Sequence, residues 1–124
     1  MNQVLSDLII GIKVTGDIQK DMVELFSFYE YQDIAEHSIK VAYEAKKLAC
    51  KFRVDEHKVF VAGCLHDLGN LFSNDKKITI CNEFRINILP EEYTAPSLLH
   101  SKISKVMAVE MFCVEDKDIL SAID

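Results

Sequence analysis

The chain has 124 residues, 49% of them hydrophobic and 27% charged, which predicts one globular domain with a single core. Its net charge of −6 argues against a partner that is a nucleic-acid duplex, because phosphate backbones attract basic faces. The longest apolar runs fall short of the ~20 residues that cross a bilayer, and the N-terminus lacks a basic signal region. We therefore expect no membrane contact and a cytoplasmic protein.

The first part of the chain predicts two short helical segments. Residues 3–14 form an apolar segment that stops around Gly11 and Gly16. Asp17 then offers an N-cap for a helix with apolar residues at helical spacing. These residues are Ile18, Met22, Leu25, Phe26 and Tyr29.

Two longer helices follow. Asp33 is expected to cap a helix over residues 34–52, and Asp55 to cap another that ends near Gly69, a good residue just after a helix. The predicted core face of the first comprises Ile34, Val41, Ala45, Leu48, Ala49 and Phe52. That of the second comprises Val59, Ala62 and Gly63.

The second half of the chain is predicted to contain a helix over 75–83 and a loop over 87–97. Ser97 is then the expected cap of a strong helix over 98–112, and Asp116 begins a last one. No segment alternates as a strand does, so the fold class is all-α. The scattered cysteines, without a CxxC pair, are expected to be reduced thiols in the core.

The last predicted helix lacks a stop signal. The stretch "DKDILSAID" has a good start but no Gly, Pro or C-cap before the chain ends after about two turns. The sequence therefore reads as cut. We expect Ile119, Leu120 and Ile123 to form an exposed apolar patch.

Three of the four histidines lie on predicted core faces. His37 is three residues after Ile34, His66 is four after Ala62, and His100 is three before Ile103. The remaining one, His57, begins a helix among charges and is expected in solvent. An aspartate, Asp67, directly follows His66.

A shared metal ion is one explanation for this pattern. A single histidine on an apolar face is usually a satisfied core residue, and a His-Asp dipeptide is common by chance. Three inward histidines from three helices, one beside a carboxylate, are harder to bury without a cation, because each unmatched polar group costs about 1–3 kcal/mol. Such ligands suit Mn²⁺, Fe²⁺, Co²⁺, Ni²⁺ or Zn²⁺, and the lack of a cysteine cluster argues against structural zinc.

The motifs "EHSIKVAYEAKKLA", "VAGCLHDLGN" and "SLLHSKISKVMAVEMF", followed by "DKDILSAI", resemble the HD-domain phosphohydrolases. The resemblance covers about residues 34–124 and is greatest to the branch of bacterial symmetrical bis(nucleosyl)tetraphosphatases, which split diadenosine tetraphosphate into two ADP. It implies an HD-type helical bundle with one or two metal ions, often iron or manganese. It further implies that His37, His66 and Asp67 bind the first ion, that Asp67 bridges, and that His100 helps to hold the second.

Two departures from the resemblance concern the site. Relatives often carry a lysine near the phosphates where this chain has Asn70. They also continue into an "HTT" segment with a further histidine and then a helix with a closing aspartate. The resemblance thus implies a bundle that is missing its C-terminal helices. It divides the chain into short N-terminal helices packed on the core, residues 1–31, and an incomplete HD-type domain, residues 32–124.

Two functions follow as alternatives. The first is a phosphohydrolase acting on a nucleotide polyphosphate, with His66 and Asp67 as catalytic residues. Lys102, Lys105 and Arg85 are candidates for phosphate contacts, although ordinary solvated side chains would look the same. The second is a degenerate module that binds a nucleotide or a protein without turnover. A small nucleotide is the expected ligand, a homodimer is a possible assembly, and a mononucleotide or cyclic nucleotide is a further possible substrate.

Overall fold

The computed structural model describes residues 3–123, and these contain helices and turns but no strand. The all-α prediction is confirmed. The helices are α1 (Gln3–Leu8), α2 (Ile18–Phe28), α3 (Gln32–Phe52), α4 (Glu56–Leu65), α5 (Asn74–Glu83), α6 (Pro90–Thr94), α7 (His100–Phe112) and α8 (Lys117–Ile123). Two short 3₁₀ turns, η1 (Leu68–Leu71) and η2 (Pro96–Leu99), precede α5 and α7.

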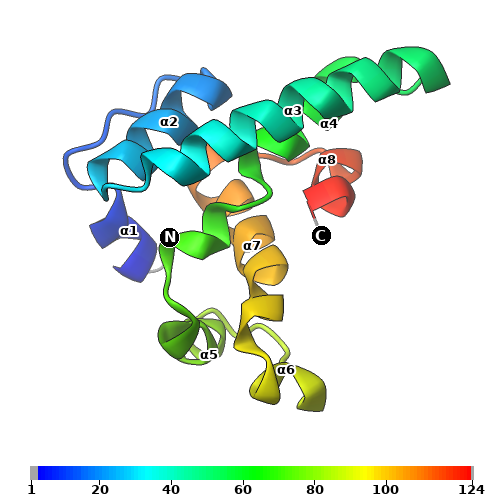
Figure 1. The fold of residues 1–124 in the computed structure, drawn as a ribbon. Coiled ribbons are helices and arrows are strands. Elements are labelled where there is room, and N and C mark those ends of the chain that lie inside the picture. The colour runs from blue at the N-terminus through cyan, green and yellow to red at the C-terminus, as the bar shows by residue number, and fades with distance from the viewer. Residues whose placement is uncertain (1–2, 124) are drawn as a thin grey trace.

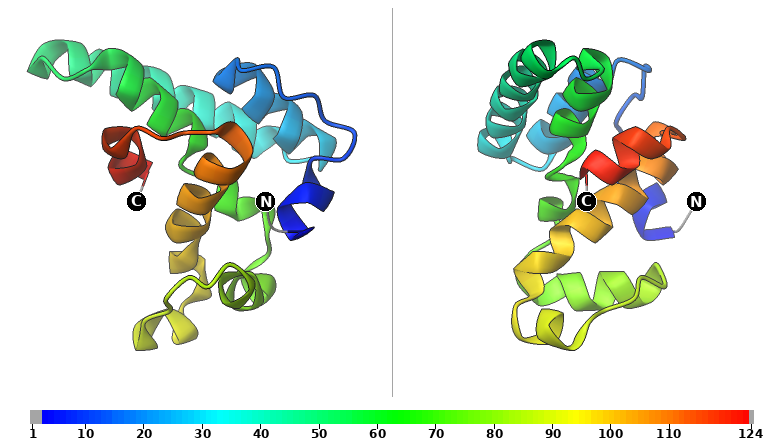
Figure 2. Two further views of the ribbon diagram at one scale, coloured as in Figure 1. Left: turned by 180° about the vertical axis from the view of Figure 1, so that it is seen from behind. Right: turned by 90° about the vertical axis from the view of Figure 1, so that its right-hand side faces the viewer.

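The helices form a bundle in which α2, α3 and α4 run along one direction and α7 crosses them (Figure 1). Helix α3 runs along one side, with α2 beside its first half and α4 packed antiparallel to it. Helix α7 runs across this layer, while α5 and α6 lie at its far end (Figure 2). Helix α8 returns to pack on α4. Among the described residues, no helix is both long and apolar enough to cross a membrane.

Small residues bring α3 and α4 into close contact. A Cβ atom on Gly63 would lie 2.6 Å from the Cα of Ala42, so only glycine allows this crossing. The residues of α3 that are buried are Ala35, Ser38, Ala42 and Ala49. The predicted core face of α3 was therefore partly wrong. Leu48 and Phe52 are 56% and 74% exposed, because the end of α3 projects beyond the rest of the bundle (Figure 1).

Two of the four residues predicted as N-caps of α2, α3, α4 and α7 cap their helices, and two do not. Asp17 and Asp55 are N-caps as expected, accepting hydrogen bonds from the amides of Lys20 and Lys58. The caps at Asp33 and Ser97 were wrong. Helix α3 begins one residue before Asp33, and Ser97 lies inside η2. In both cases no side chain caps the helix that follows.

Helix α4 ends at Leu65 and not near Gly69 as predicted. Gly69 instead lies in η1, where the chain passes against the first turn of α7. A Cβ atom there would collide with the carbonyl oxygen of His100 and lie 2.9 Å from its Cα. This glycine is therefore required by a close approach of two backbone segments, and not by a helix end.

The predicted loop over 87–97 contains α6 and the first half of η2. An ion pair closes this segment: the Lys102 ammonium donates to Glu92 Oε1 at 2.7 Å and to the carbonyl of Asn87 at 2.9 Å. The cysteine prediction holds for Cys64 and Cys81, which are buried free thiols. It was wrong for the free thiols of Cys50 and Cys113, which are exposed.

Helix α8 begins after Asp116, whose carboxylate accepts from the amide of Asp118. The expected exposed patch was wrong, because Ile119 and Ile123 are 8% and 4% exposed and Leu120 is half-buried. They join the core where α8 packs on α4 and α7. The end of the chain at Asp124 lies outside the described residues, and the predicted division at residues 31 and 32 stays a prediction.

Candidate metal centre

The site is built where α4 ends and the chain turns into η1. His66 is the residue after α4, and its Nδ1 lies 2.6 Å from the carbonyl oxygen of Gly63. A carbonyl only accepts, so Nδ1 carries the hydrogen of that bond. The other ring nitrogen, Nε2, lies 3.2 Å from Oδ2 of Asp67. Backbone geometry therefore fixes both the orientation and the protonated nitrogen of this imidazole.

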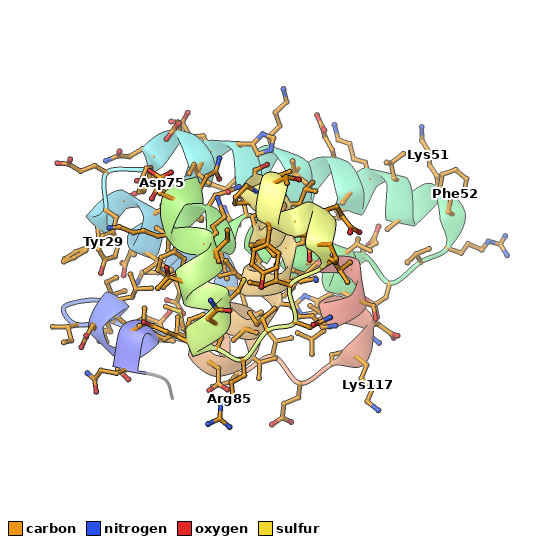
Figure 3. The ribbon with its side chains drawn as sticks, turned by 90° about the horizontal axis from the view of Figure 1, so that it is seen from below. Tyr29, Lys51, Phe52, Asp75, Arg85 and Lys117 are labelled. Carbon is orange, nitrogen blue, oxygen red and sulfur yellow. The ribbon has the colours of Figure 1, made fainter. Side chains whose placement is uncertain are left out.

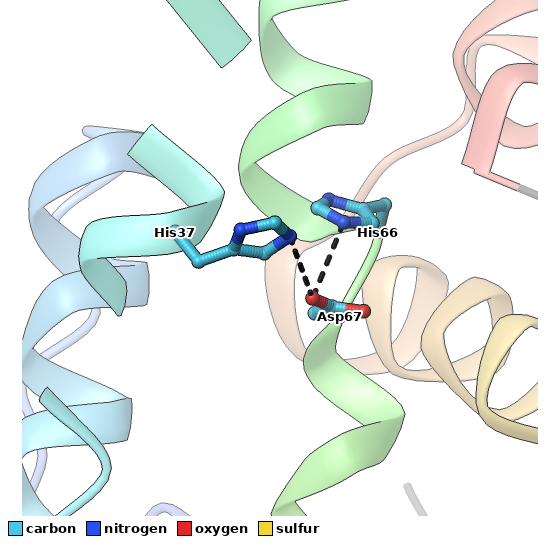
Figure 4. A group of neighbouring side chains, drawn as sticks. All are labelled: His37, His66 and Asp67. Atoms are coloured by element: carbon cyan, nitrogen blue, oxygen red, sulfur yellow. Dashed lines mark ion pairs between the residues drawn. The ribbon is translucent and has the colours of Figure 1, made fainter. Parts of the chain in front are cut away.

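His37 approaches the same carboxylate from α3 (Figure 4). Its Nε2 lies 3.7 Å from Oδ2 of Asp67, and its ring centroid is 5.7 Å from that of His66. The prediction that His37 shares the core face was wrong, because its side chain is 58% exposed. Ala35 and Ser38 are the buried residues of this turn of α3, whereas the side chain of His37 lies at the edge of the buried face.

His100 reaches Asp67 from the opposite side, at the start of α7. Its Nε2 lies 3.7 Å from Oδ1, the other carboxylate oxygen, and its Nδ1 lies 2.8 Å from the carbonyl of Ser97. The same i−3 bond to a carbonyl thus orients His100 and His66. The two oxygens of Asp67 face different histidines: Oδ2 faces His37 and His66, and Oδ1 faces His100.

Ser104 fixes the scaffold under this carboxylate. Its buried hydroxyl accepts from the amide of Gly69 at 2.8 Å. The same hydroxyl lies 2.9 Å from the carbonyl of His66 and 2.7 Å from that of His100, and it donates to this pair. One side chain therefore ties the end of α4, η1 and the first turn of α7 together.

The charges of the cluster shift its titration. The hydrogen bond to Asp67 raises the pKa of His66, although burial acts in the opposite direction. The hydrogen bond from His66 lowers the pKa of Asp67, and the charges of His66, His100 and His37 add to this effect against its partial burial. Asp67 is accordingly a carboxylate at neutral pH.

This donor set fits a divalent cation. One ligand atom from each of His37, His66 and Asp67 lies within 4.8 Å of the others. Because the Nδ1 hydrogens of His66 and His100 point to carbonyls, their Nε2 lone pairs face a carboxylate unless a proton or a metal lies between them. Histidine and carboxylate ligands with outer hydrogen bonds to carbonyls are typical of transition-metal sites.

Of the three predicted phosphate contacts, Lys102 is bound elsewhere and Arg85 points elsewhere. The Lys102 ammonium is bound to Glu92 and Asn87, as described above, and Lys105 is half-buried on α7. Arg85 is exposed beyond α5 with a left-handed backbone, and its side chain points away from the molecule (Figure 3). His57 is exposed as predicted.

Asn70, which the sequence analysis singled out, contacts the site in a way that the sequence did not predict, and Lys77 was missed. The side-chain amide of Asn70 donates to Oδ1 of Asp67 at 3.2 Å. Lys77, on α5, is 3% exposed, and its pKa responds to the charge of Asp67. The signal for Lys77 was its spacing of three and four residues before Ile80 and Cys81, which places it on the apolar face of its helix.

An apolar groove of about 340 Å³ opens beside His66, between α3, α4 and α8. Its walls include Val41, Ala62 and Ile123. The groove and the cluster share His66, so a ligand in the groove would lie next to the cluster.

Comparisons with known proteins give two curated relatives. Over 71 residues the chain is 38% identical to a Lactococcus lactis subsp. cremoris protein described as "Uncharacterized protein in pepC 5'region", covering 57% of this chain and 36% of that one. Over 89 residues it is 33% identical to a Mycoplasma genitalium protein named "Probable nicotinate-nucleotide adenylyltransferase/Ap4A hydrolase", covering 71% of this chain and 24% of that one. The matched part of this chain thus spans about a third and a quarter of these relatives. No solved structure matches.

The family comparison covers most of the chain. Residues 34–124 match the HD domain family, and this range includes His37, His66, Asp67 and His100. The family is one of metal-binding domains associated with phosphohydrolase activity, which agrees with the His/His/Asp cluster. The chain belongs to the HD domain family.

Proposed function

We propose that this chain is a metal-dependent phosphohydrolase domain that acts on a nucleotide polyphosphate such as diadenosine tetraphosphate. The proposed metal ligands are His37, His66, Asp67 and His100. Iron or manganese is the proposed metal, as one or two ions, with cobalt, nickel or zinc as alternatives that fit the same ligands.

One observation carries the proposal. Both His66 and His100 donate Nδ1–H to a carbonyl three residues earlier, and both direct Nε2 at the carboxylate of Asp67. Two imidazoles that are fixed with their lone pairs toward a carboxylate form a cation site before any cation binds. Such preorganisation is what a catalytic metal centre needs.

The substrate class has weaker and separate support. The Mycoplasma genitalium relative has Ap4A hydrolase in its name. The apolar groove beside His66 offers a surface to the ring of a nucleotide whose phosphates lie at the cluster. Together these favour a nucleotide over inorganic polyphosphate.

In this proposal each residue has a physical task. A divalent ion, when bound, supplies a Lewis acid for phosphoryl oxygens and lowers the pKa of water. Asp67 would supply the negative charge that holds an ion, and its two oxygens face different histidines. His66 stays oriented by Gly63, so it needs no rearrangement when substrate arrives. Roles of Lys102, Lys105 and Arg85 at the phosphates stay predictions.

The alternative is a module that binds a nucleotide without turnover. Asn70 favours it, because its amide occupies Oδ1 of Asp67, the oxygen that a second ion would need. In this case a metal still binds at His37 and His66, and nucleotide binds, but no product forms.

The test measures metal content and diadenosine tetraphosphate hydrolysis of protein purified without chelator, with Mn²⁺, Co²⁺ or Fe²⁺ added. We expect turnover that falls by more than about 100-fold in Asp67→Asn, because removing a ligand affects a metal site more than removing an outer partner does. His57→Ala is the matched control, since this exposed histidine lies outside the cluster.

The outcomes separate the candidates. Nucleotide binding without turnover under any metal supports the module. Less than a tenth of an equivalent of metal in folded wild-type protein after reconstitution contradicts both, because both need the cluster as a cation site.

A further inference from the structure

Lys77 is a buried cation for which the described residues provide no anion. Its residue surface is 3% exposed, although lysine is rarely buried without a partner. Its ammonium donates to Oδ1 of Asn74 at 2.7 Å, a neutral acceptor in the same turn of α5. Within residues 3–123 it takes part in no ion pair.

The position of Lys77 is set by elements that also hold the metal cluster. Helix α5 follows Asp67 after the single turn η1, and it packs against η2 and α7, the elements that bring His100 to the site. Burial lowers the pKa of Lys77, and the charge of Asp67 acts in the opposite direction with a smaller effect. The carboxylate therefore acts on the lysine electrostatically, but these two described side chains form no hydrogen bond or ion pair with each other.

A buried ammonium with one neutral acceptor is incompletely satisfied. It has three donors, and burying a charge without a counter-ion is unfavourable. A group that carries negative charge and several acceptor oxygens would complete it. Phosphoryl groups have this chemistry, and the Asp67 cluster is the proposed place for them.

We infer that Lys77 is a substrate-binding residue that holds a phosphoryl oxygen of a nucleotide bound at the Asp67 cluster. The inference rests on the proposed function for the identity of the ligand. Unlike Lys102, whose ammonium is paired with Glu92, Lys77 has no carboxylate among its ion-pair partners in the described residues. This role of Lys77 also explains how the site can do without a lysine at position 70, where Asn70 contacts Asp67 instead.

The experiment compares ADP binding by calorimetry to Mn²⁺-loaded wild-type protein, Lys77→Met and Lys77→Gln. Lys76→Met is the matched control, because Lys76 is the adjacent lysine on the exposed face of α5. We expect Kd for ADP to rise by about tenfold or more in both Lys77 variants, the usual effect of losing a charged hydrogen bond. The control should stay within twofold of wild type.

Two further readouts exclude a structural role. Manganese content should be unchanged in the Lys77 variants, and the melting temperature of metal-free Lys77→Met should equal or exceed that of wild type, because an unpaired buried charge is removed. Unchanged ADP affinity in either folded variant overturns the inference, as does wild-type protein that binds no ADP. Failure of both variants to fold also overturns it, since Lys77 would then be a structural residue.

Failure of the inference can be told from failure of the proposed function. Turnover of diadenosine tetraphosphate by wild type, together with unchanged ADP binding in the Lys77 variants, removes Lys77 alone. Weakened ADP binding in those variants without wild-type turnover keeps Lys77 and favours the binding module.

Discussion

The two sides of Asp67 differ in how they are held. On one side lies a buried scaffold, in which Gly69, Ser104 and the backbone of His100 are in close contact. On the other side lie ligand side chains that are open to solvent, above all His37, with 58% of its side chain exposed. The scaffold is fixed by packing and by the hydrogen bonds of Ser104, whereas His66 and His100 are oriented by hydrogen bonds to carbonyls of their own turns.

This difference separates the fold from the chemistry. Changes in the scaffold should unfold the domain or displace the carboxylate, whereas changes in the ligands should weaken metal binding and leave the fold intact. The site is therefore a set of replaceable side chains on a backbone arrangement that tolerates little change.

The largest expected effect is on the scaffold side, from Gly69→Ala. The added methyl group would collide with the backbone of His100, which cannot move without displacing α7. We expect a loss of about 3 kcal/mol or more in the free energy of unfolding. Urea denaturation followed by circular dichroism measures it.

The control for this variant is Ser121→Ala, at an exposed helical position. Its free energy of unfolding should change by less than about 0.5 kcal/mol. Equal stability of Gly69→Ala and wild type would contradict the close approach of η1 and α7.

A smaller effect is expected on the ligand side, from His37→Ala. We expect Mn²⁺ or Fe²⁺ affinity to fall by about tenfold to a hundredfold, a range seen when contributors to metal sites are removed. The metal-free variant should unfold within about 0.5 kcal/mol of wild type, because the side chain is largely exposed. Metal titration and urea denaturation of the same samples test both statements.

The result for His37 is informative in either direction. A variant that retains metal affinity but loses stability would reverse the assignment, since His37 would then belong to the scaffold. His57→Ala, with a comparable exposed histidine, controls for the loss of any imidazole.

The smallest expected effect is on pH dependence. The pKa of His66 is raised above 6.5, chiefly by its hydrogen bond with Asp67. In the metal-free protein its contribution to stability is present below pH 6.5 and is lost as pH rises through the raised pKa. Metal binding has the opposite sign, because it needs the unprotonated imidazole, so affinity should rise on the order of a few-fold from pH 6 to 8. Metal titrations across this range measure the rise in affinity, and melting of metal-free protein measures the loss of stability. Affinity and stability that change in the same direction with pH would contradict this account.

Much of the site could be predicted from the sequence. His66, Asp67 and His100 were identified from helical spacing and from resemblance, and they meet in the structure. His37 was expected to lie there for a partly wrong reason: it reaches Asp67 from the rim of α3 and not from its core face. Spacing fixes which residues share a helical face, but it does not fix how far a neighbouring helix covers that face.

The remaining differences have a common physical origin. Large apolar residues dominated the prediction for α3, yet its buried positions are small ones such as Ala42, because α4 approaches too closely for more. Gly69 was interpreted as a helix end, although what it permits is a contact with a residue 31 positions later in the chain. Contacts between distant backbone segments leave no periodic pattern, so the predictions that failed were those that depended on them.

The openness of His37 also has a consequence for which ion is present in a cell. A ligand that is mostly in water can leave and rejoin without disturbing the backbone, so an ion held through it is expected to exchange quickly with its surroundings. Occupancy would then follow the supply of divalent ions and vary with growth conditions. Chelation should strip such a centre within a short dialysis, and re-addition of a different ion should replace it without refolding.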